Sequence, residues 1–233
     1  MTTAQAPSNV LGVGIYTISE AATYARVAAA KLARWIIGTS NSRPAVKAQI
    51  DPSKNSERWI TFLDFVQAMA IRDIRITKKI PLEKIREAIE MARSQFGIEY
   101  PFARKHTTWL LGEDIRLSIE NVGLIEASGV HKTQLDLKPV VEPYLEDLSY
   151  DAHGLADGYK PFTWKGYDIV FDPAIQFGEP FVRPGRHTVV TLCDAFDVEG
   201  GYDAAAKVFD VKPEAIEAAR KYYFDYLRPS DTM

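Results

Sequence analysis

The sequence predicts an α+β protein that is rich in helix. Residues 16–38 and 61–97 carry apolar side chains at helical spacing. Residues 106–137 change to short, partly alternating segments separated by Gly or Asn, a pattern typical of a small β-meander. Helical spacing then returns after Gly200-Gly201 and predicts a small C-terminal helical bundle. The expected domains are residues 12–105, 106–163 and 164–233.

The first domain begins with two short helices joined by a tight turn. Thr17 and Glu20 have the spacing of a capping box, which satisfies the first backbone amides of a helix. A polar break at Arg26-Val27 ends this helix, and Val27 is expected to fill the angle between the two helices. The second helix presents one apolar face, made of Leu32, Trp35 and Ile36.

The opposite face of the second helix carries small and cationic residues. These are Ala30, Lys31, Ala33, Arg34 and Ile37. A slim helix with positive charge on its outer side has the properties that docking in the DNA major groove requires. The alternative is an ordinary helical hairpin.

This stretch resembles the start of MerR-like winged-helix domains. The matching residues are Tyr16, Thr17, Ile18, Glu20, Ala22, Val27, Leu32 and Trp35. The resemblance implies a winged helix-turn-helix that binds DNA, over about residues 12–105. Arg26 stands where that family usually has Gly, and Ala28, Ala29 and Ala30 replace polar residues that usually contact DNA. In that family a long coiled-coil helix builds the dimer, but here Pro101 arrives too soon for this route.

Residues 39–59 are rich in turn formers and lie where a winged helix has its wing hairpin. Arg43, Lys47, Lys54 and Arg58 give this segment a positive edge that suits phosphate contacts, although a solvated basic loop would look the same. The candidate DNA-binding residues are Thr17, Ala30, Lys31, Arg34, Arg43, Lys54 and Arg58.

Two longer helices follow, and then a less regular middle region. Thr61 opens the first helix, and Pro81 lies just inside the second, which Gly97 ends. After the expected β-meander, residues 138–163 are interrupted by Pro and Gly and predict a linker with one short helix around 141–148.

The last domain is expected to start with a strand over Asp168–Phe171 and to continue as three helices. The helices are predicted over Val189–Val198, Tyr202–Phe209 and Pro213–Leu227. The second and third of these are joined by the short connection Asp210-Val211-Lys212, which gives a second helix-turn-helix geometry.

This segment resembles a small domain of unknown function found beside PIN-domain toxins. The matching residues are Ile169, Val170, Asp172, Pro173, Ile175, Gly178, Pro180 and Arg186. With the N-terminal domain, the chain resembles a VapB-type antitoxin of a type II toxin–antitoxin pair. The resemblance implies a protein without catalytic residues that neutralises a PIN-domain ribonuclease and represses its own operon by binding operator DNA. Arg183, Arg186 and Arg228 are the candidate toxin-binding residues, because a cation could fill the carboxylate cluster of such a nuclease.

Charge is distributed unevenly along the chain. Residues 1–105 hold 16 Lys and Arg against 9 Asp and Glu, a net charge of +7, and residues 106–233 hold 12 against 22, a net charge of −10. A basic half and an acidic half suggest two tasks on two different partners, while mutual attraction of the halves is the simpler alternative.

The composition also predicts what kind of protein this is not. No run of 18 apolar residues occurs and Met1 to Asn9 does not resemble a signal peptide, so we expect a cytoplasmic protein without a membrane partner. Cys193 lies in an apolar run and is expected to be buried and inert. The four histidines have no metal-ligand spacing, so we expect neither a metal nor a cofactor and no enzymatic activity.

Two other functions remain open at this stage. In the first, the chain is a MerR-like transcriptional regulator that responds to a ligand, with residues 106–163 as the effector region. The aromatic residues of this region and its surroundings favour that alternative; they are Trp109, Tyr144, Tyr159, Phe162 and Trp164. In the second, the protein is a nuclease or another enzyme. Besides the toxin and operator DNA, a second copy of the chain, in a homodimer, is a candidate partner of the antitoxin.

Overall fold

The computed structural model describes residues 10–50, 58–77, 79–105, 107–111, 114–119, 123–128 and 146–228. These residues form helices and antiparallel β-sheets, which confirms the α+β class. The chain divides into two compact units, Met1–Asp157 and Gly158–Met233. The finer division into three domains stays a prediction.

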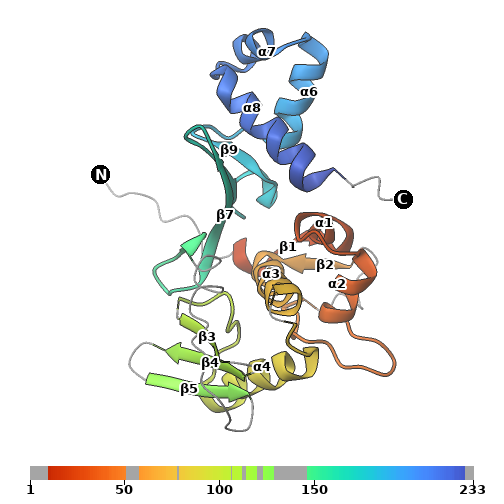
Figure 1. Cartoon of the computed structure of the whole chain (residues 1–233), viewed down its shortest axis with the longest axis vertical. Coiled ribbons are helices and arrows are strands. Elements are labelled where there is room, and N and C mark those ends of the chain that lie inside the picture. Colours follow the sequence, from red (N-terminus) through yellow and green to blue (C-terminus); the bar gives the residue numbers. More distant parts are fainter. Residues whose placement is uncertain are drawn as a thin grey trace. The chain divides into compact units, whose positions relative to one another are not determined.

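The first unit begins with a strand that the sequence did not indicate. A short 3-10 helix, η1 (Val10–Gly12), leads into β1 (Gly14–Thr17), which pairs antiparallel with β2 (Trp59–Thr61). Helices α1 (Ile18–Tyr24) and α2 (Ala29–Ile36) lie between these strands in the sequence, and α3 (Phe62–Thr77) follows β2 directly (Figure 1).

The start and the end of α1 agree with the sequence. Both bonds of the capping box are present: the Glu20 amide donates to Thr17 Oγ1 at 3.2 Å, and the Thr17 amide donates to Glu20 Oε2 at 2.8 Å. The helix ends before Arg26, whose φ of 55° lies in the left-handed region that favours Gly. This conformation is the physical reason why a Gly would suit that position.

An apolar core joins α1, α2 and α3. Leu32, Trp35 and Ile36 are buried, as predicted for the inner face of α2. The ring of Tyr16 lies 5.1 Å from that of Phe65. In α3, the side chains of Phe62, Phe65, Val66 and Met69 are all buried. Because one face of α2 is held in this core, its opposite face must point outward.

A buried carboxylate closes the beginning of α3. Asp64 Oδ2 accepts hydrogen bonds from the Thr61 amide at 3.1 Å and from Thr61 Oγ1 at 2.9 Å. The same carboxylate accepts from the Gln49 amide at 3.3 Å, so it also ties the segment before β2 to α3. Burial raises the pKa of Asp64, while its hydrogen bonds to Thr61 and Gln49 oppose this rise.

Helix α4 (Leu82–Phe96) follows, and Gly97 ends it in the left-handed conformation, as predicted. Strands β3 (Thr107–Leu111), β4 (Asp114–Ile119) and β5 (Gly123–Ser128) then pair antiparallel in sequential order, which confirms a β-meander over these residues. The last part of the predicted meander, residues 129–137, lies outside the described residues. Helix α4 packs against β4 and β5 (Figure 1).

The stretch expected to be a linker is partly β-structure. Strand β6 (Leu148–Tyr150) neighbours β7 (Ala156–Trp164) in the sheet. Strand β7 forms although it contains one Gly and one Pro, Gly158 and Pro161. The expectation of an irregular linker through residue 163 was therefore wrong over β7. Most of the short helix predicted at 141–148 falls outside the described residues, and Leu148 belongs to β6.

The second unit combines a sheet with three helices. Strands β7, β8 (Tyr167–Phe171) and β9 (Phe181–Arg183) pair antiparallel, with the 3-10 helix η2 (Gln176–Gly178) before β9. Helices α6 (Val189–Glu199), α7 (Tyr202–Phe209) and α8 (Pro213–Tyr222) match the predicted bounds closely and pack together (Figure 1). The expected end of the last helix is a π-helix, η3 (Tyr223–Leu227).

Gly38 is the position where backbone conformation and space both exclude a side chain. Its φ is +85°, and an added Cβ would lie 2.6 Å from the Ser42 carbonyl oxygen. We expect Gly38→Ala to lower the free energy of unfolding by about 2 kcal/mol or more, measured by urea denaturation. Gly97→Ala is the matched control: its φ is +65° but nothing lies within 4 Å of the added Cβ. An equal loss in both variants would contradict the role of the Ser42 contact.

Candidate functional site

The outward face of α2 presents small and cationic side chains in the predicted way. Ala30, Lys31 and Arg34 are exposed. Ala33 and Ile37, which the helical wheel also placed on this face, are only half-buried and mark its margin. The ammonium of Lys31 lies 5.8 Å from the ring centroid of Trp35, one helical turn away. The exposed face is therefore narrow and positively charged.

The start of α2 is also accessible to a ligand. Its N-cap, Ala28, has an extended backbone and supplies no side-chain hydrogen bond, because alanine has no acceptor. Ala28, Ala29 and Ala30 are all exposed. First-turn amides that lack a side-chain cap remain available to water or to an anion such as phosphate. Thr17, by contrast, already uses its hydroxyl in the capping box of α1.

The segment after α2 continues the positive surface. The side chains of Arg43 and Lys47 are exposed, as is that of Arg58 just before β2. Lys54 lies outside the described residues. The amides of Ala45 and Val46 both donate to the Trp35 carbonyl, at 2.6 and 3.3 Å, so this segment folds back onto the end of α2. Arg43 and Lys47 thus flank two residues that are hydrogen-bonded to the end of α2.

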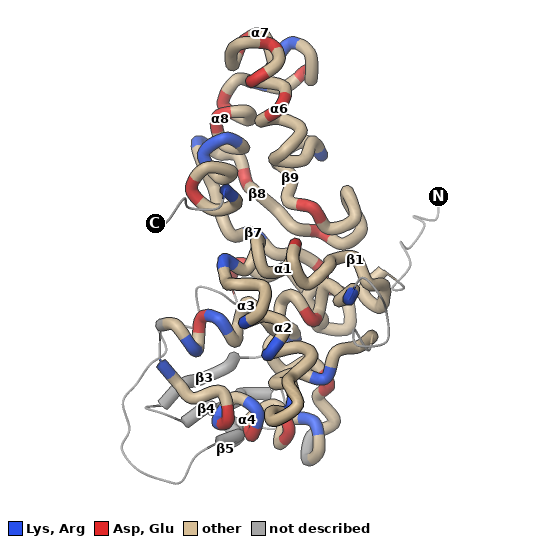
Figure 2. The backbone as a smooth tube through the Cα atoms, turned by 90° about the vertical axis from the view of Figure 1, so that its right-hand side faces the viewer, with Lys and Arg blue, Asp and Glu red and all other residues tan. Residues whose placement is uncertain are grey.

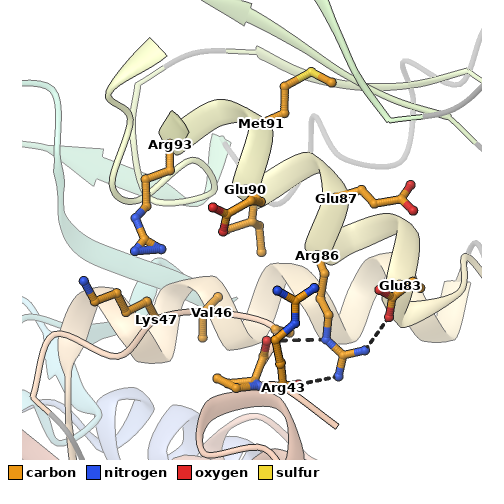
Figure 3. Close-up of a pocket in the computed structure, with 12 residues that line it drawn as sticks. Arg43, Val46, Lys47, Glu83, Arg86, Glu87, Glu90, Met91 and Arg93 are labelled. Atoms are coloured by element: carbon orange, nitrogen blue, oxygen red, sulfur yellow. Dashed lines mark hydrogen bonds and ion pairs between the residues drawn. The ribbon is translucent and has the colours of Figure 1, made fainter. Parts of the chain in front are cut away.

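Arg86 of α4 also holds the segment after α2, through hydrogen bonds to residues 42–44. Its Nη2 donates to the Arg43 carbonyl at 2.6 Å and to Ser42 Oγ at 2.7 Å, and its Nε donates to the Pro44 carbonyl at 3.4 Å. Nη1 pairs with Glu83 Oε2 at 2.8 Å. Figure 3 shows Arg86 extending from α4 toward Arg43. The side chain is only 14% exposed, so these bonds form in a partly desolvated place.

Sequence reasoning missed Arg86. It lies among Glu83, Glu87 and Glu90, where a charged residue of an amphipathic helix normally faces solvent. Its acceptors in the segment 42–44 lie more than 40 positions earlier in the chain. No local pattern in the sequence carries that information, and only the packing of α4 reveals it.

A cavity of about 470 Å³ opens between the segment 43–47 and α4. Four cationic side chains line it, and its remaining lining is acidic or apolar; the cations are Arg43, Lys47, Arg86 and Arg93. Figure 3 shows Lys47 and Arg93 on one side of this space and Arg86 with Glu83 on the other. Figure 2 shows both cationic and acidic residues along α4. The cavity has a mixed charge rather than a purely basic lining.

The three arginines proposed for toxin binding have different surroundings in the second unit. Arg183 pairs with Asp168 Oδ2 at 3.4 Å and is 55% exposed. Arg186 is exposed, and its carbonyl accepts a hydrogen bond from Gln176 Nε2 at 2.9 Å. Arg228 follows η3, and its guanidinium lies 5.5 Å from the ring centroid of Phe224. All three are accessible. Arg183 ends β9 and Arg186 lies in the turn that follows it, whereas Arg228 lies after η3.

The described residues contain no group of three or more His, Cys, Asp or Glu side chains placed to hold a metal ion. Cys193 is buried in α6, as predicted, and burial raises the pKa of its thiol to about 12. None of the helices within the described ranges has both the length and the hydropathy to cross a membrane.

Arg86 should be replaceable without loss of the overall fold. We expect Arg86→Met to lower the free energy of unfolding by about 1–3 kcal/mol and to accelerate hydrogen exchange of the Ala45 amide, because the segment 42–44 loses its donors. Arg93→Met is the control, since the interaction that Arg93 makes within the described residues is a 3.4 Å ion pair with the exposed Glu99. Unchanged exchange at Ala45 in Arg86→Met would show that Arg86 does not hold this segment.

No protein-family model matches the chain. Two proteins of Mycobacterium tuberculosis are similar to it over nearly their whole length. "Uncharacterized protein Rv2308" is 24% identical over 229 residues, which cover 92% of this chain and 94% of that protein. "Putative antitoxin VapB45" is 22% identical over 222 residues, which cover 89% of this chain and 92% of that protein.

A solved structure is similar as well. The X-ray crystal structure of Rv2018 from Mycobacterium tuberculosis matches with a TM-score of 0.63 and 18% identity, covering 89% of this chain and 97% of that chain. At this identity the likeness concerns the fold. The chain is thus a distant relative of a protein that carries an antitoxin name, and it shares its fold with Rv2018.

Proposed function

We propose that this protein is an antitoxin of a type II toxin–antitoxin pair, which neutralises a PIN-domain ribonuclease and regulates its own operon through its N-terminal domain. The observation that carries the proposal is the similarity to the VapB45 protein over 89% of this chain. An alignment of that extent includes residues of both compact units, so it links the basic and the acidic part of the chain to one relative.

The DNA-binding part of the proposal rests on the first unit. A helix with one buried face and an exposed face of Ala30, Lys31 and Arg34 has the shape and charge for a major groove. The MerR-like resemblance of residues 16–35 supports a winged helix-turn-helix in this unit, although the described residues 39–50, where the wing hairpin was expected, form no strand. Arg43, Lys47 and Arg58 would add phosphate contacts beside the helix.

The toxin-binding part rests on the second unit. Helices α6 and α7 carry acidic residues, marked in red in Figure 2, which suit the basic surface of an RNA-binding nuclease. The exposed guanidinium groups of Arg183, Arg186 and Arg228 would suit the acidic metal site of the nuclease, since such a site attracts a cation. Inhibition would then combine coverage of the substrate surface with a cation near the active carboxylates.

A second candidate function has one observation in its favour. The cavity of about 470 Å³ beside α4 has both apolar and charged lining, as small-molecule sites do. A ligand there would contact Arg86 and could alter the segment that Arg86 fixes. A metabolite that raises the melting temperature and changes the affinity for DNA would favour a ligand-responsive regulator.

The DNA contact predicts a specific effect of salt. We expect Lys31→Ala and Arg34→Ala each to weaken binding to the DNA upstream of the chain's own gene. Each should also reduce the slope of log K against log salt by about one unit, because one phosphate contact is lost. Lys207→Ala, which removes an exposed cation of the second unit, is the control.

Trp35→Ala should instead unfold the first unit, since loss of the buried ring lowers the free energy of unfolding by about 3–5 kcal/mol.

The toxin contact predicts a partner with hidden activity. Purification of the tagged chain from its native cells should yield a small protein whose ribonuclease activity appears only after the two are separated under denaturing conditions and refolded. Reversal of charge in Arg183, Arg186 and Arg228 together should prevent inhibition in a ribonuclease assay with the purified pair. Intact inhibition by this triple variant would end the idea that arginines fill the active site.

A further inference from the structure

An aromatic side chain stands out from the second unit on an unfavourable backbone. Phe177 is 82% exposed. Its φ is 53° and that of Gln176 is 49°, so two consecutive bulky residues adopt the left-handed region. A backbone of this kind persists only where the surroundings hold it, and it occurs preferentially at functional positions.

Hydrogen bonds hold the loop that carries Phe177. The Glu179 amide donates to the Gln176 carbonyl at 3.0 Å, and the Ala174 amide donates to Asp172 Oδ1 at 2.8 Å. Gln176 Nε2 donates to the Arg186 carbonyl at 2.9 Å, which joins this loop to the turn after β9. Phe177 is therefore exposed on a loop whose conformation is held by hydrogen bonds.

Three other exposed side chains are tied to the same loop. The backbone bond from Gln176 brings Arg186 near it. The Val189 amide donates to the Pro180 carbonyl at 2.8 Å, which places the 44% exposed Val190 beside the chain that follows Glu179. We call Phe177, Glu179, Arg186 and Val190 the Phe177 patch. Within the described part of the chain, neither Glu179 nor Arg186 forms an ion pair.

We propose that the Phe177 patch is the contact between two copies of this chain related by a two-fold axis. Such an interface places the same patch on both sides, so each Arg186 would meet the second copy's Glu179 while the Phe177 rings pack near the axis. Phe177 and Val190 are apolar, and Glu179 and Arg186 carry opposite charges, so the patch can be complementary in charge to a second copy of itself. A partner with one dominant sign of charge would leave one of the two groups opposed by a like charge.

A second copy also fits the first unit. Helix-turn-helix proteins commonly read two half-sites as dimers. Here α4 ends at Gly97 and a strand follows within the described residues, so no long helix extends from the first unit there to build a coiled coil. The Phe177 patch would supply this dimer contact. Arg186 is a candidate contact in both proposals, so a toxin that binds Arg186 would compete with the second copy for it.

Sedimentation of the full chain, without DNA or toxin, tests the aromatic anchor. We expect concentration-dependent dimerisation of the natural protein, and in Phe177→Ser a dissociation constant raised at least about tenfold. Val198→Ser is the matched control, because Val198 is 79% exposed and lies outside the patch. Both variants should keep the melting temperature of the natural protein measured at a concentration where it is monomeric. A natural protein that stays monomeric, or equal dimerisation of Phe177→Ser, would overturn the proposal.

Charge exchange tests the two-fold arrangement. Arg186→Glu leaves two acidic groups in the patch and Glu179→Arg leaves two basic ones, so each variant alone should be monomeric. A 1:1 mixture should form heterodimers, and the double variant Glu179→Arg/Arg186→Glu should recover the homodimer. A mixture that remains monomeric would refute the pairing. Because no DNA or toxin is present, this outcome is separate from any failure of the proposed antitoxin function.

Discussion

The structure of the first unit depends on the hydrogen bonds made by the backbone segment after α2. Residues 42–46 belong to no helix or extended strand, yet Ala45 and Val46 are buried, and buried backbone groups require hydrogen-bond partners. One carbonyl, that of Trp35, accepts from two amides, and one guanidinium, that of Arg86, serves two carbonyls and a hydroxyl. Through these bonds α2 and α4, which are far apart in the chain, hold a single segment between them.

This arrangement relates stability to the proposed DNA interface. The buried face of α2 fixes its exposed face, and the Trp35 carbonyl at its end fixes the segment with Arg43 and Lys47. The cations of helix and segment therefore belong to one preorganised unit, so little conformational entropy would be lost on binding. The turn between α1 and α2 is strained at Arg26, because a glycine would adopt its positive φ more easily.

Local patterns in the sequence predicted the elements that have local causes. The capping box of Thr17 and Glu20, the stop at Gly97 and the bounds of α6 and α7 follow from neighbouring residues and helical spacing. The pairing of β1 with β2 was missed, because strands of three or four residues form only through a partner far along the chain. Strand β7 was missed for a related reason, since its Gly158 and Pro161 indicate a turn unless neighbouring strands hold the backbone extended.

The candidate sites divide in the same way. The exposure of Lys31 and Arg34 followed from the helical period of α2. Arg86 and Phe177 could not be found by such reasoning: the first acts on a distant backbone, and the second stands out only through its exposure and its φ. One charged residue among several in an amphipathic helix and one aromatic residue in a loop have no distinctive sequence context.

The single thiol has a practical consequence. Cys193 is buried and its pKa is raised to about 12, so it holds almost no thiolate at neutral pH and reacts slowly with alkylating reagents. With respect to maleimide chemistry, the natural chain behaves almost as if it had no cysteine. One cysteine introduced at an exposed position would therefore accept a fluorophore selectively, without prior removal of the native thiol from the core of α6.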